Sequence, residues 1–167
     1  MENKKAMSEI VTTILMIGLV LGLVAVTWSV INNMVDKELK NTEACFGNFD
    51  KITINGAYTC YNSSLGANKF YFSINVGDIE LDEILIAIGN QGTTDSITLN
   101  STSTVIADIT NYPSNTPGVS APSANSGKTY IHSGFATVPD YIRISPVIGG
   151  EKCQESDALT NIETCSL

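Results

Sequence analysis

The chain has 167 residues, 43% of them hydrophobic and 16% charged, so its length allows one domain with an appendage. Residues 1–40 carry four basic and four acidic side chains, whereas residues 41–167 carry five basic and thirteen acidic ones. The net charge of −8 therefore belongs to the second part of the chain. This distribution argues against nucleic acid as a partner, because phosphate binding requires a basic surface.

The first predicted element is a membrane-spanning helix. Residues 10–31 form a run of 22 residues without a charge, followed by further apolar residues at helical spacing, so we expect the helix to continue to about Lys40. The run would span about 33 Å, enough to cross a bilayer core, and it is longer than the apolar part of a secretory signal peptide. Lys4 and Lys5 precede it, which predicts a cytoplasmic N-terminus and an outside location for the rest. Trp28 is expected near the outer membrane boundary.

Small residues on this helix indicate a packing surface. Gly18 and Gly22 form a GxxxG pattern, with Ala25 on a neighbouring face, and such a pattern lets two helices approach closely. Glycine is also common in spanning helices, so a packing role and a neutral role both remain open.

Four cysteines lie downstream of the helix, and their even number in an oxidising compartment predicts two disulfides. We expect the pairs Cys45–Cys60 and Cys153–Cys165, because each closes a short loop. Zinc binding is the alternative, but the sequence has no CxxC motif and a single histidine, so no metal is expected.

Two sequons are candidates for N-glycosylation outside the cell. They begin at Asn62 and Asn100. Such triplets also occur by chance, so modification at either position stays open.

Residues 41–167 predict an all-β domain, either a β-sandwich or an open barrel, and the whole chain is therefore α+β. Residues 70–76 alternate apolar and polar side chains as in a half-buried strand, and the more continuously apolar residues 81–88 predict a central strand. Asn55-Gly56 predicts the turn of a hairpin between residues 52–54 and 57–61. Residues 111–128 contain three prolines and predict a long exposed loop. Shorter strands are expected at residues 96–99, 104–109, 129–131, 135–138 and 141–144.

Catalytic and metal-binding motifs are sparse, and we expect neither an enzyme nor a cofactor. His132 is followed by Ser133, but this pair alone does not make a triad, and a structural histidine is the simpler interpretation. The acidic residues from Asp78 to Glu83 could hold calcium, yet they lack the EF-hand spacing and are more typical of a solvated strand face.

The N-terminal residues carry a family resemblance. The stretch Lys4-Lys5-Ala6-Met7-Ser8-Glu9-Ile10, a basic leader followed by a small residue and an apolar helix, resembles the class III signal of archaeal type IV pilins and archaellins. The stretch from Pro139 to Cys165 is similar to the C-terminal end of archaeal pilin-like proteins.

The resemblance implies a processing site and an assembly residue. A membrane peptidase would cleave after Lys5 and Ala6, leaving Met7 as the first residue of the mature chain. Glu9 would then be the third mature residue, where the bacterial pilins have their glutamate fifth. Glu9 would pair with the new amino terminus of a neighbouring subunit, or it would simply favour the positive end of its own helix dipole.

The resemblance also implies a function and an organisation. Residues 1–6 would be a leader, residues 7–40 a helix that moves from the membrane into a filament core, and residues 41–167 an extracellular domain. The chain would be a pilin that polymerises with itself for adhesion or surface contact, and its other partners would be the prepilin peptidase and the pilus assembly machinery. The alternative is an uncleaved single-pass membrane protein whose β domain binds a ligand.

Overall fold

The structure is a computed structural model that describes the backbone of residues 3–64 and 68–165. The side chains of residues 3–10, 37–44 and Phe49 lie outside this description. The chain divides into two compact units, Met1–Thr42 and Glu43–Leu167, and each is described by itself.

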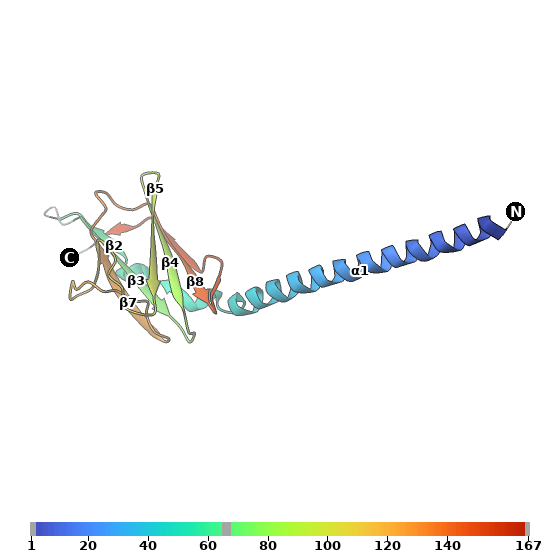
Figure 1. The fold of residues 1–167 in the computed structure, drawn as a ribbon. Coiled ribbons are helices and arrows are strands. Elements are labelled where there is room, and N and C mark those ends of the chain that lie inside the picture. Colours follow the sequence, from blue (N-terminus) through green and yellow to red (C-terminus); the bar gives the residue numbers. More distant parts are fainter. Residues whose placement is uncertain (1–2, 65–67, 166–167) are drawn as a thin grey trace. The chain divides into compact units, whose positions relative to one another are not determined.

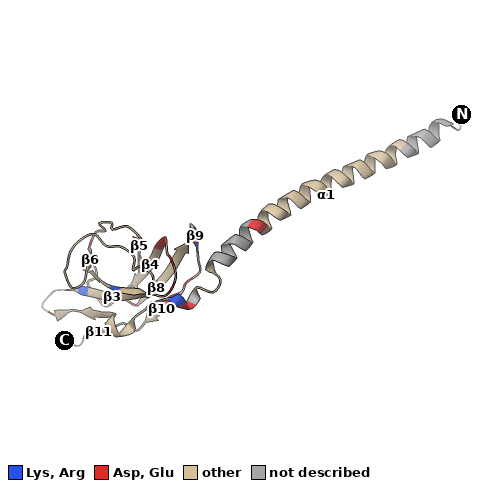
Figure 2. Cartoon of the chain, turned by 90° about the horizontal axis from the view of Figure 1, so that it is seen from below, with Lys and Arg blue, Asp and Glu red and all other residues tan. Residues whose placement is uncertain are grey.

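The first unit belongs to the long helix α1, Asn3–Cys45, which is drawn in blue to cyan in Figure 1. Its segment Val11–Asp36 has a mean hydropathy of 2.6 and is long enough to cross a membrane. Every side chain from residue 11 to residue 36 is exposed, and Figure 2 shows that this stretch is almost free of charge. Thr27 donates its hydroxyl to the carbonyl of Leu23 at 2.8 Å, which keeps its polar group satisfied within the helix. The predicted apolar helix is thus confirmed as a helix.

The second unit is built from strands in two sheets (Figure 1). Within the described residues the first sheet has six strands in the order β11-β2-β3-β7-β6, with β1 also paired to β3. All its pairings are antiparallel except that of β11 with β2. The strands are β1 (Ile52–Ile54), β2 (Cys60–Asn62), β3 (Lys69–Val76), β6 (Ile109–Asn111), β7 (Ser126–His132) and β11 (Glu163–Thr164).

The second sheet has five strands among the described residues, in the order β10-β8-β4-β5 with β9 paired to β8. Its strands are β4 (Glu83–Asn90), β5 (Thr93–Asn100), β8 (Tyr141–Ile148), β9 (Glu151–Lys152) and β10 (Asp157–Thr160). The continuously apolar segment forms β4, which pairs on both sides, with β5 and with β8. The prediction of a central strand there is confirmed.

One hydrophobic core takes side chains from both sheets. The alternation in β3 places Phe70, Phe72 and Ile74 fully inside, and Ile84 and Ile88 of β4 are also fully buried. Because successive side chains of a strand point to opposite faces, Tyr71 of β3 lies on the other, outward face of the first sheet. The predicted order of a helix followed by an all-β domain is therefore confirmed.

The predicted hairpin at Asn55-Gly56 is wrong. Both β1 and β2 pair with β3, one after the other, and residues Gly56–Tyr58 form a single 3₁₀ turn between them. The side chain of Asn55 accepts a hydrogen bond from the backbone N–H of Ala57 at 3.1 Å, which stabilises this turn. Segments β1 and β2 are thus one interrupted strand along the same edge of β3.

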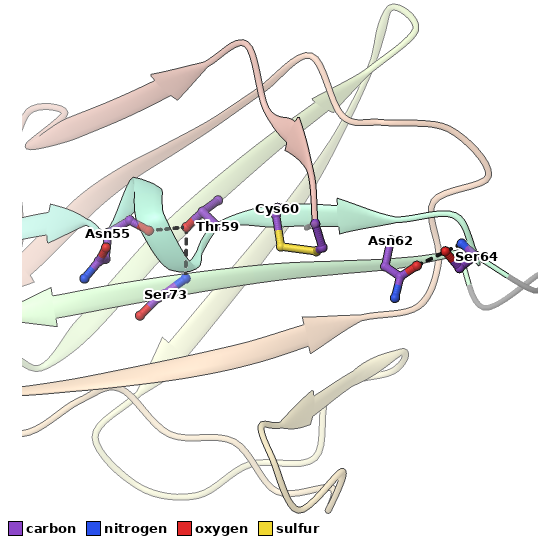
Figure 3. Close-up of a disulfide and its surroundings, with 7 residues drawn as sticks. Asn55, Thr59, Cys60, Asn62, Ser64 and Ser73 are labelled. Carbon is purple, nitrogen blue, oxygen red and sulfur yellow. Dashed lines mark hydrogen bonds between the residues drawn. A yellow bond between two sulfur atoms is a disulfide. The ribbon is translucent and has the colours of Figure 1, made fainter. Parts of the chain in front are cut away.

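Thr59 supplies side-chain hydrogen bonds at the point where the strand is interrupted, as Figure 3 shows. Its hydroxyl donates to the carbonyl of Asn55 at 2.8 Å and accepts the N–H of Ser73 at 3.2 Å. Both Thr59 and Ser73 are buried, so the hydroxyl satisfies the N–H of Ser73 and gives the Asn55 carbonyl a second donor beside the N–H of Tyr58.

Three further predictions differ from the structure. Residues 104–109 do not form one strand, because Thr104 makes only an isolated bridge and Ile109 begins β6. Residues 135–138 form no strand, although Phe135 is buried in the core. Residues 111–128 are not a wholly exposed loop, because Val119 is fully buried and pairs with Thr104 in an isolated bridge. Part of the predicted loop also belongs to β7, which begins at Ser126.

Candidate functional site

The helix presents the first candidate site, an uncovered surface with two glycines. A Cβ atom added at Gly18 or at Gly22 would meet nothing within 4 Å. Residues four apart lie on one face of a helix, so the two glycines mark a shallow strip that this chain leaves empty. Ala25 is exposed as well. The predicted processing residues Lys5, Ala6 and Met7, together with Glu9, belong to α1, but their side chains lie outside the described residues.

The two disulfides are present, but the predicted pairing is wrong. Cys45 bonds to Cys153 and Cys60 bonds to Cys165, and these links join residues 108 and 105 positions apart. The first ties the last residue of α1 to the segment after β9, and the second ties β2 to the segment after β11. The parallel pairing of β11 with β2 explains the second link, since it places Glu163 opposite Cys60 and brings Cys165 close. Short loop length was therefore a poor guide to the pairing.

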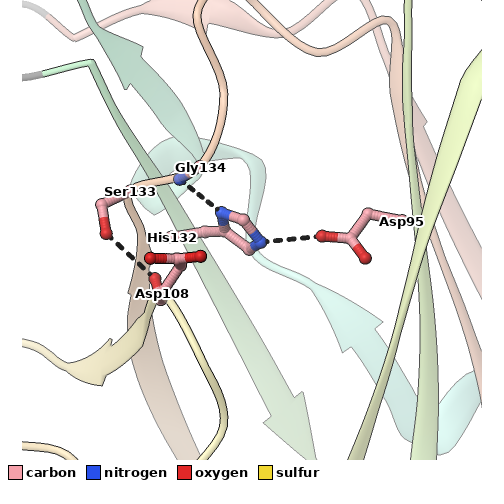
Figure 4. A network of polar contacts seen from close by, with 5 residues as sticks. All are labelled: Asp95, Asp108, His132, Ser133 and Gly134. Carbon is pink, nitrogen blue, oxygen red and sulfur yellow. Dashed lines mark hydrogen bonds and ion pairs between the residues drawn. The ribbon is translucent and has the colours of Figure 1, made fainter.

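His132 forms a polar contact between the two sheets (Figure 4). It lies at the end of β7 with its side chain 5% exposed, and its Nε2 is 3.0 Å from Oδ2 of Asp95 on β5. Its Nδ1 accepts the backbone N–H of Gly134 at 3.0 Å. This hydrogen bond assigns the proton of the neutral ring to Nε2, which donates to Asp95. The ring also stacks on Phe135, with 4.4 Å between the ring centroids.

Ser133 does not join this network as a nucleophile. Its hydroxyl donates to the carbonyl of Asp108 at 3.2 Å, and Figure 4 shows it turned away from the imidazole ring. A nucleophile needs a base within hydrogen-bond reach. The interpretation of His132 as a structural residue agrees with these contacts.

The acidic residues Asp78, Glu80, Asp82 and Glu83 do not converge on a cation. In the described part of the chain no three His, Cys, Asp or Glu side chains are grouped so as to hold a metal ion. Asp78 accepts the amide of Asn125 at 3.2 Å, and Asp82 accepts the N–H of Gly150 at 2.8 Å. These carboxylates therefore stabilise neighbouring turns.

The two sequons differ in their surroundings. Oδ1 of Asn62 accepts the backbone N–H of Ser64 at 2.8 Å (Figure 3), so its Nδ2 group is the part of the amide left to interact elsewhere. Asn100 ends β5, and its Oδ1 is buried without a hydrogen-bond partner among the described atoms.

A pocket on the outer face of the six-stranded sheet has no counterpart in the sequence predictions. We call it the tyrosine pocket; it encloses about 370 Å³ and is lined by Ala57, Tyr58, Cys60, Asn62, Tyr71, Tyr112, Thr129 and Cys165. Tyr71 and Tyr112 meet edge to face, with 5.8 Å between the ring centroids and 86° between the ring planes. The three tyrosines come from separate segments, and Tyr58 and Tyr112 are exposed while Tyr71 is half-buried, so only their positions on the surface could have indicated the pocket. Tyr71 is the clearest of these signals, because it occupies an outward position of β3.

The described residues thus include an exposed apolar helix and a β domain that has two disulfides and a pocket lined by aromatic rings. Comparisons with protein families, with curated proteins and with solved structures give no match for this chain.

Proposed function

We propose that this chain is the structural subunit of an archaeal type IV pilus-like surface filament that serves adhesion or surface contact. The observation that carries the proposal is the exposed apolar surface of α1 from residue 11 to residue 36. A surface of this kind needs an apolar environment that the rest of the chain does not provide. Lipid provides it before assembly, and copies of the same helix provide it in a filament.

The glycines support a change of partner from lipid to helix. In lipid there is little hydrophobic drive for helices to associate, and association depends on close packing at small residues. Gly18 and Gly22 supply such a strip, because a Cβ atom at either position would meet nothing within 4 Å beyond the backbone of its own helix. Assembly would bring the helices of neighbouring subunits together there, with the β domains on the outside.

The β domain suits an exposed position on the filament surface. Both disulfides favour an oxidising compartment outside the cell. The acidic charge of the segment that follows the helix supports solubility of a densely repeated surface. The peptidase site at Lys5, Ala6 and Met7 rests on the resemblance of the N-terminal residues to the class III signal.

The competing function is a single-pass membrane protein that stays uncleaved and binds a ligand as a monomer. The tyrosine pocket favours it, because a concave aromatic site is typical of ligand binding. A filament subunit can also carry a binding pocket, so processing and assembly decide between the two.

Mass spectrometry of the N-terminal peptide tests the proposal. The chain is isolated both from membranes and from filaments sheared off the cell surface. We expect the sheared material to begin at Met7, with the full leader present only in the membrane fraction. An Ala6→Leu variant, which changes the small residue before the cleavage site, should remain uncleaved and absent from the sheared fraction. Intact leader confined to membranes in the unaltered protein would contradict the filament function and favour the anchored monomer.

A further inference from the structure

The tyrosine pocket is uncharged and wide enough for one small ligand. None of its eight lining residues carries a formal charge, although the sequence around it is acidic overall. Its volume of about 370 Å³ lies at the lower end of the range found for small-molecule sites. A neutral ligand of modest size fits this combination, whereas a phosphate or another anion would find no opposite charge there.

The floor of the pocket is held in place by covalent and backbone contacts. The Cys60–Cys165 disulfide lies within it, and the N–H of Cys165 donates to the carbonyl of Tyr61 at 2.9 Å. The N–H of Tyr112 donates to the carbonyl of Thr129 at 3.0 Å. The rings that line the pocket are therefore attached to fixed backbone, and binding would cost little ordering.

Two of the rings are more than half exposed to solvent. Tyr58 is 66% exposed and Tyr112 is 54% exposed, and Tyr112 is nearly perpendicular to Tyr71. The pocket thus offers aromatic faces in two orientations. Polar groups lie beside them, namely the phenolic hydroxyls and the Nδ2 group of Asn62, whose Oδ1 already accepts a hydrogen bond from Ser64.

We infer that the tyrosine pocket binds the ring of a neutral sugar that belongs to an external saccharide. One face of a pyranose presents C–H groups with partial positive charge, which stack on the electron-rich face of an aromatic ring. The hydroxyls at the rim of the sugar would exchange hydrogen bonds with the tyrosine hydroxyls and with Asn62. Stacking and rim hydrogen bonds together need flat rings beside amide and hydroxyl groups, which is the composition of this pocket.

Sugar binding would be the contact that an adhesive filament makes with another surface. The binding itself does not depend on the proposed function, and only its strengthening by repetition along a filament rests on that function. A single shallow pocket would bind weakly, but repetition along a filament would raise the effective affinity for a surface that carries many copies of the sugar. Binding by the isolated chain needs no filament, so the two hypotheses can fail separately.

The test uses the full chain, produced in a host without N-glycosylation and held in micelles of a detergent that has no sugar headgroup. The probes are the methyl glycosides of glucose, galactose, mannose and N-acetylglucosamine. We expect saturation-transfer NMR to show transfer to the ring C–H protons of at least one of them, with a dissociation constant in the millimolar range. The Tyr112→Ala variant should bind about tenfold more weakly, as when an aromatic anchor is truncated, whereas Tyr112→Phe keeps the ring and most of the affinity.

A matched control is Tyr141→Ala, which removes a half-buried tyrosine from the other sheet and should leave binding unchanged. Circular dichroism of each variant checks that the β domain remains folded. Absence of transfer to all four glycosides would overturn the inference, and so would binding that survives both Tyr112→Ala and Tyr71→Ala. A glycan on Asn62 of the native protein that fills the pocket would also overturn it, because the site would then belong to the chain's own sugar.

Discussion

The two units of this chain differ in whether their apolar side chains are buried or exposed. In the β domain most of the large apolar side chains are inside, in one core shared between two sheets, and two long-range disulfides link distant parts of the chain. In the helix every side chain from residue 11 to residue 36 is exposed, including Trp28 at 66%. The β domain therefore contains its own stabilising contacts, whereas the apolar stretch of the helix depends on its surroundings.

This difference predicts which property a substitution in each unit should change. A change in the β domain should alter the free energy of unfolding of one molecule, because its partners lie in the same chain. A change on the helix should alter association with lipid or with other copies, because within the chain it has almost no partners to lose. Three sets of substitutions test this contrast, in order of decreasing expected effect.

The largest effect is expected at the glycine strip of the helix. Replacing Gly18 by Leu should abolish filaments, because the larger side chain holds neighbouring helices apart. The free energy of unfolding of the β domain should not change, since a Cβ at this position meets nothing within 4 Å. Electron microscopy of sheared fractions measures the filaments, and immunoblotting of membranes measures the precursor.

Val20→Leu is the matched control for the glycine variant. It adds apolar volume on a different face of the same helix and replaces no small residue, so filaments should persist. Normal filaments from both Gly18→Leu and Gly22→Leu would contradict the packing role of the strip. Loss of the precursor from membranes would instead indicate an effect on insertion.

The second effect concerns the disulfides of the β domain. Removing one pair, with Cys60→Ala and Cys165→Ala together, should lower the free energy of unfolding by about 4 kcal/mol, because the bond closes a loop of roughly a hundred residues. Guanidinium unfolding of the full chain in micelles, followed by near-ultraviolet circular dichroism, measures the loss. The Cys45→Ala and Cys153→Ala pair should cost a similar amount, since its loop is of similar length.

Peptide mapping of the non-reduced protein checks the pairing itself. We expect linked peptides that contain Cys45 with Cys153 and Cys60 with Cys165. Links between Cys45 and Cys60, or between Cys153 and Cys165, would show that the pairing described here is wrong. Four free thiols would contradict the outside location as well.

The disulfides also mark the limit of what the sequence could predict. Strands β3 and β4 were predictable because the alternation of Phe70, Phe72 and Ile74 and the apolar run of β4 are local patterns. The partner of Cys60 depends on which strands lie side by side, and the parallel pairing of β11 with β2 joins segments about a hundred residues apart. No local spacing carries that information.

The hairpin was predicted wrongly and the pocket was not predicted at all, for related reasons. Asn55-Gly56 favours a tight turn, but the side chain of Asn55 accepts the N–H of Ala57 and stabilises a 3₁₀ turn in its place. The tyrosine pocket collects rings from the 3₁₀ turn, from β3 and from the residue after β6. Each ring alone is an ordinary surface tyrosine, and only the folded sheet shows that they meet.

The smallest effect is expected at Tyr130, a fully buried residue of β7 whose hydroxyl donates to the carbonyl of Ser120 at 2.7 Å. Burial raises the pKa of this hydroxyl above the usual tyrosine value of about 10, because the phenolate would lose its hydration. Above that pH the unfolded chain releases the proton while the folded chain keeps it. The contribution of Tyr130 to stability is therefore complete below pH 10 and falls as the pH rises further, by up to about 1.4 kcal/mol per pH unit.

Tyr130→Phe removes both the hydrogen bond and this pH dependence. Below pH 10 the variant should be less stable by about 1 kcal/mol, the net worth of one hydrogen bond, while Lys128 still contacts the Ser120 carbonyl at 3.4 Å. Above pH 10 the difference between the two proteins should shrink and then change sign, because only the unaltered protein has to keep this phenol neutral. Denaturant unfolding of both proteins between pH 8 and pH 12 measures the difference. A difference that stays constant over this range would mean that Tyr130 titrates alike in the folded and unfolded chains, and that the β domain shields this residue from water far less than its burial implies.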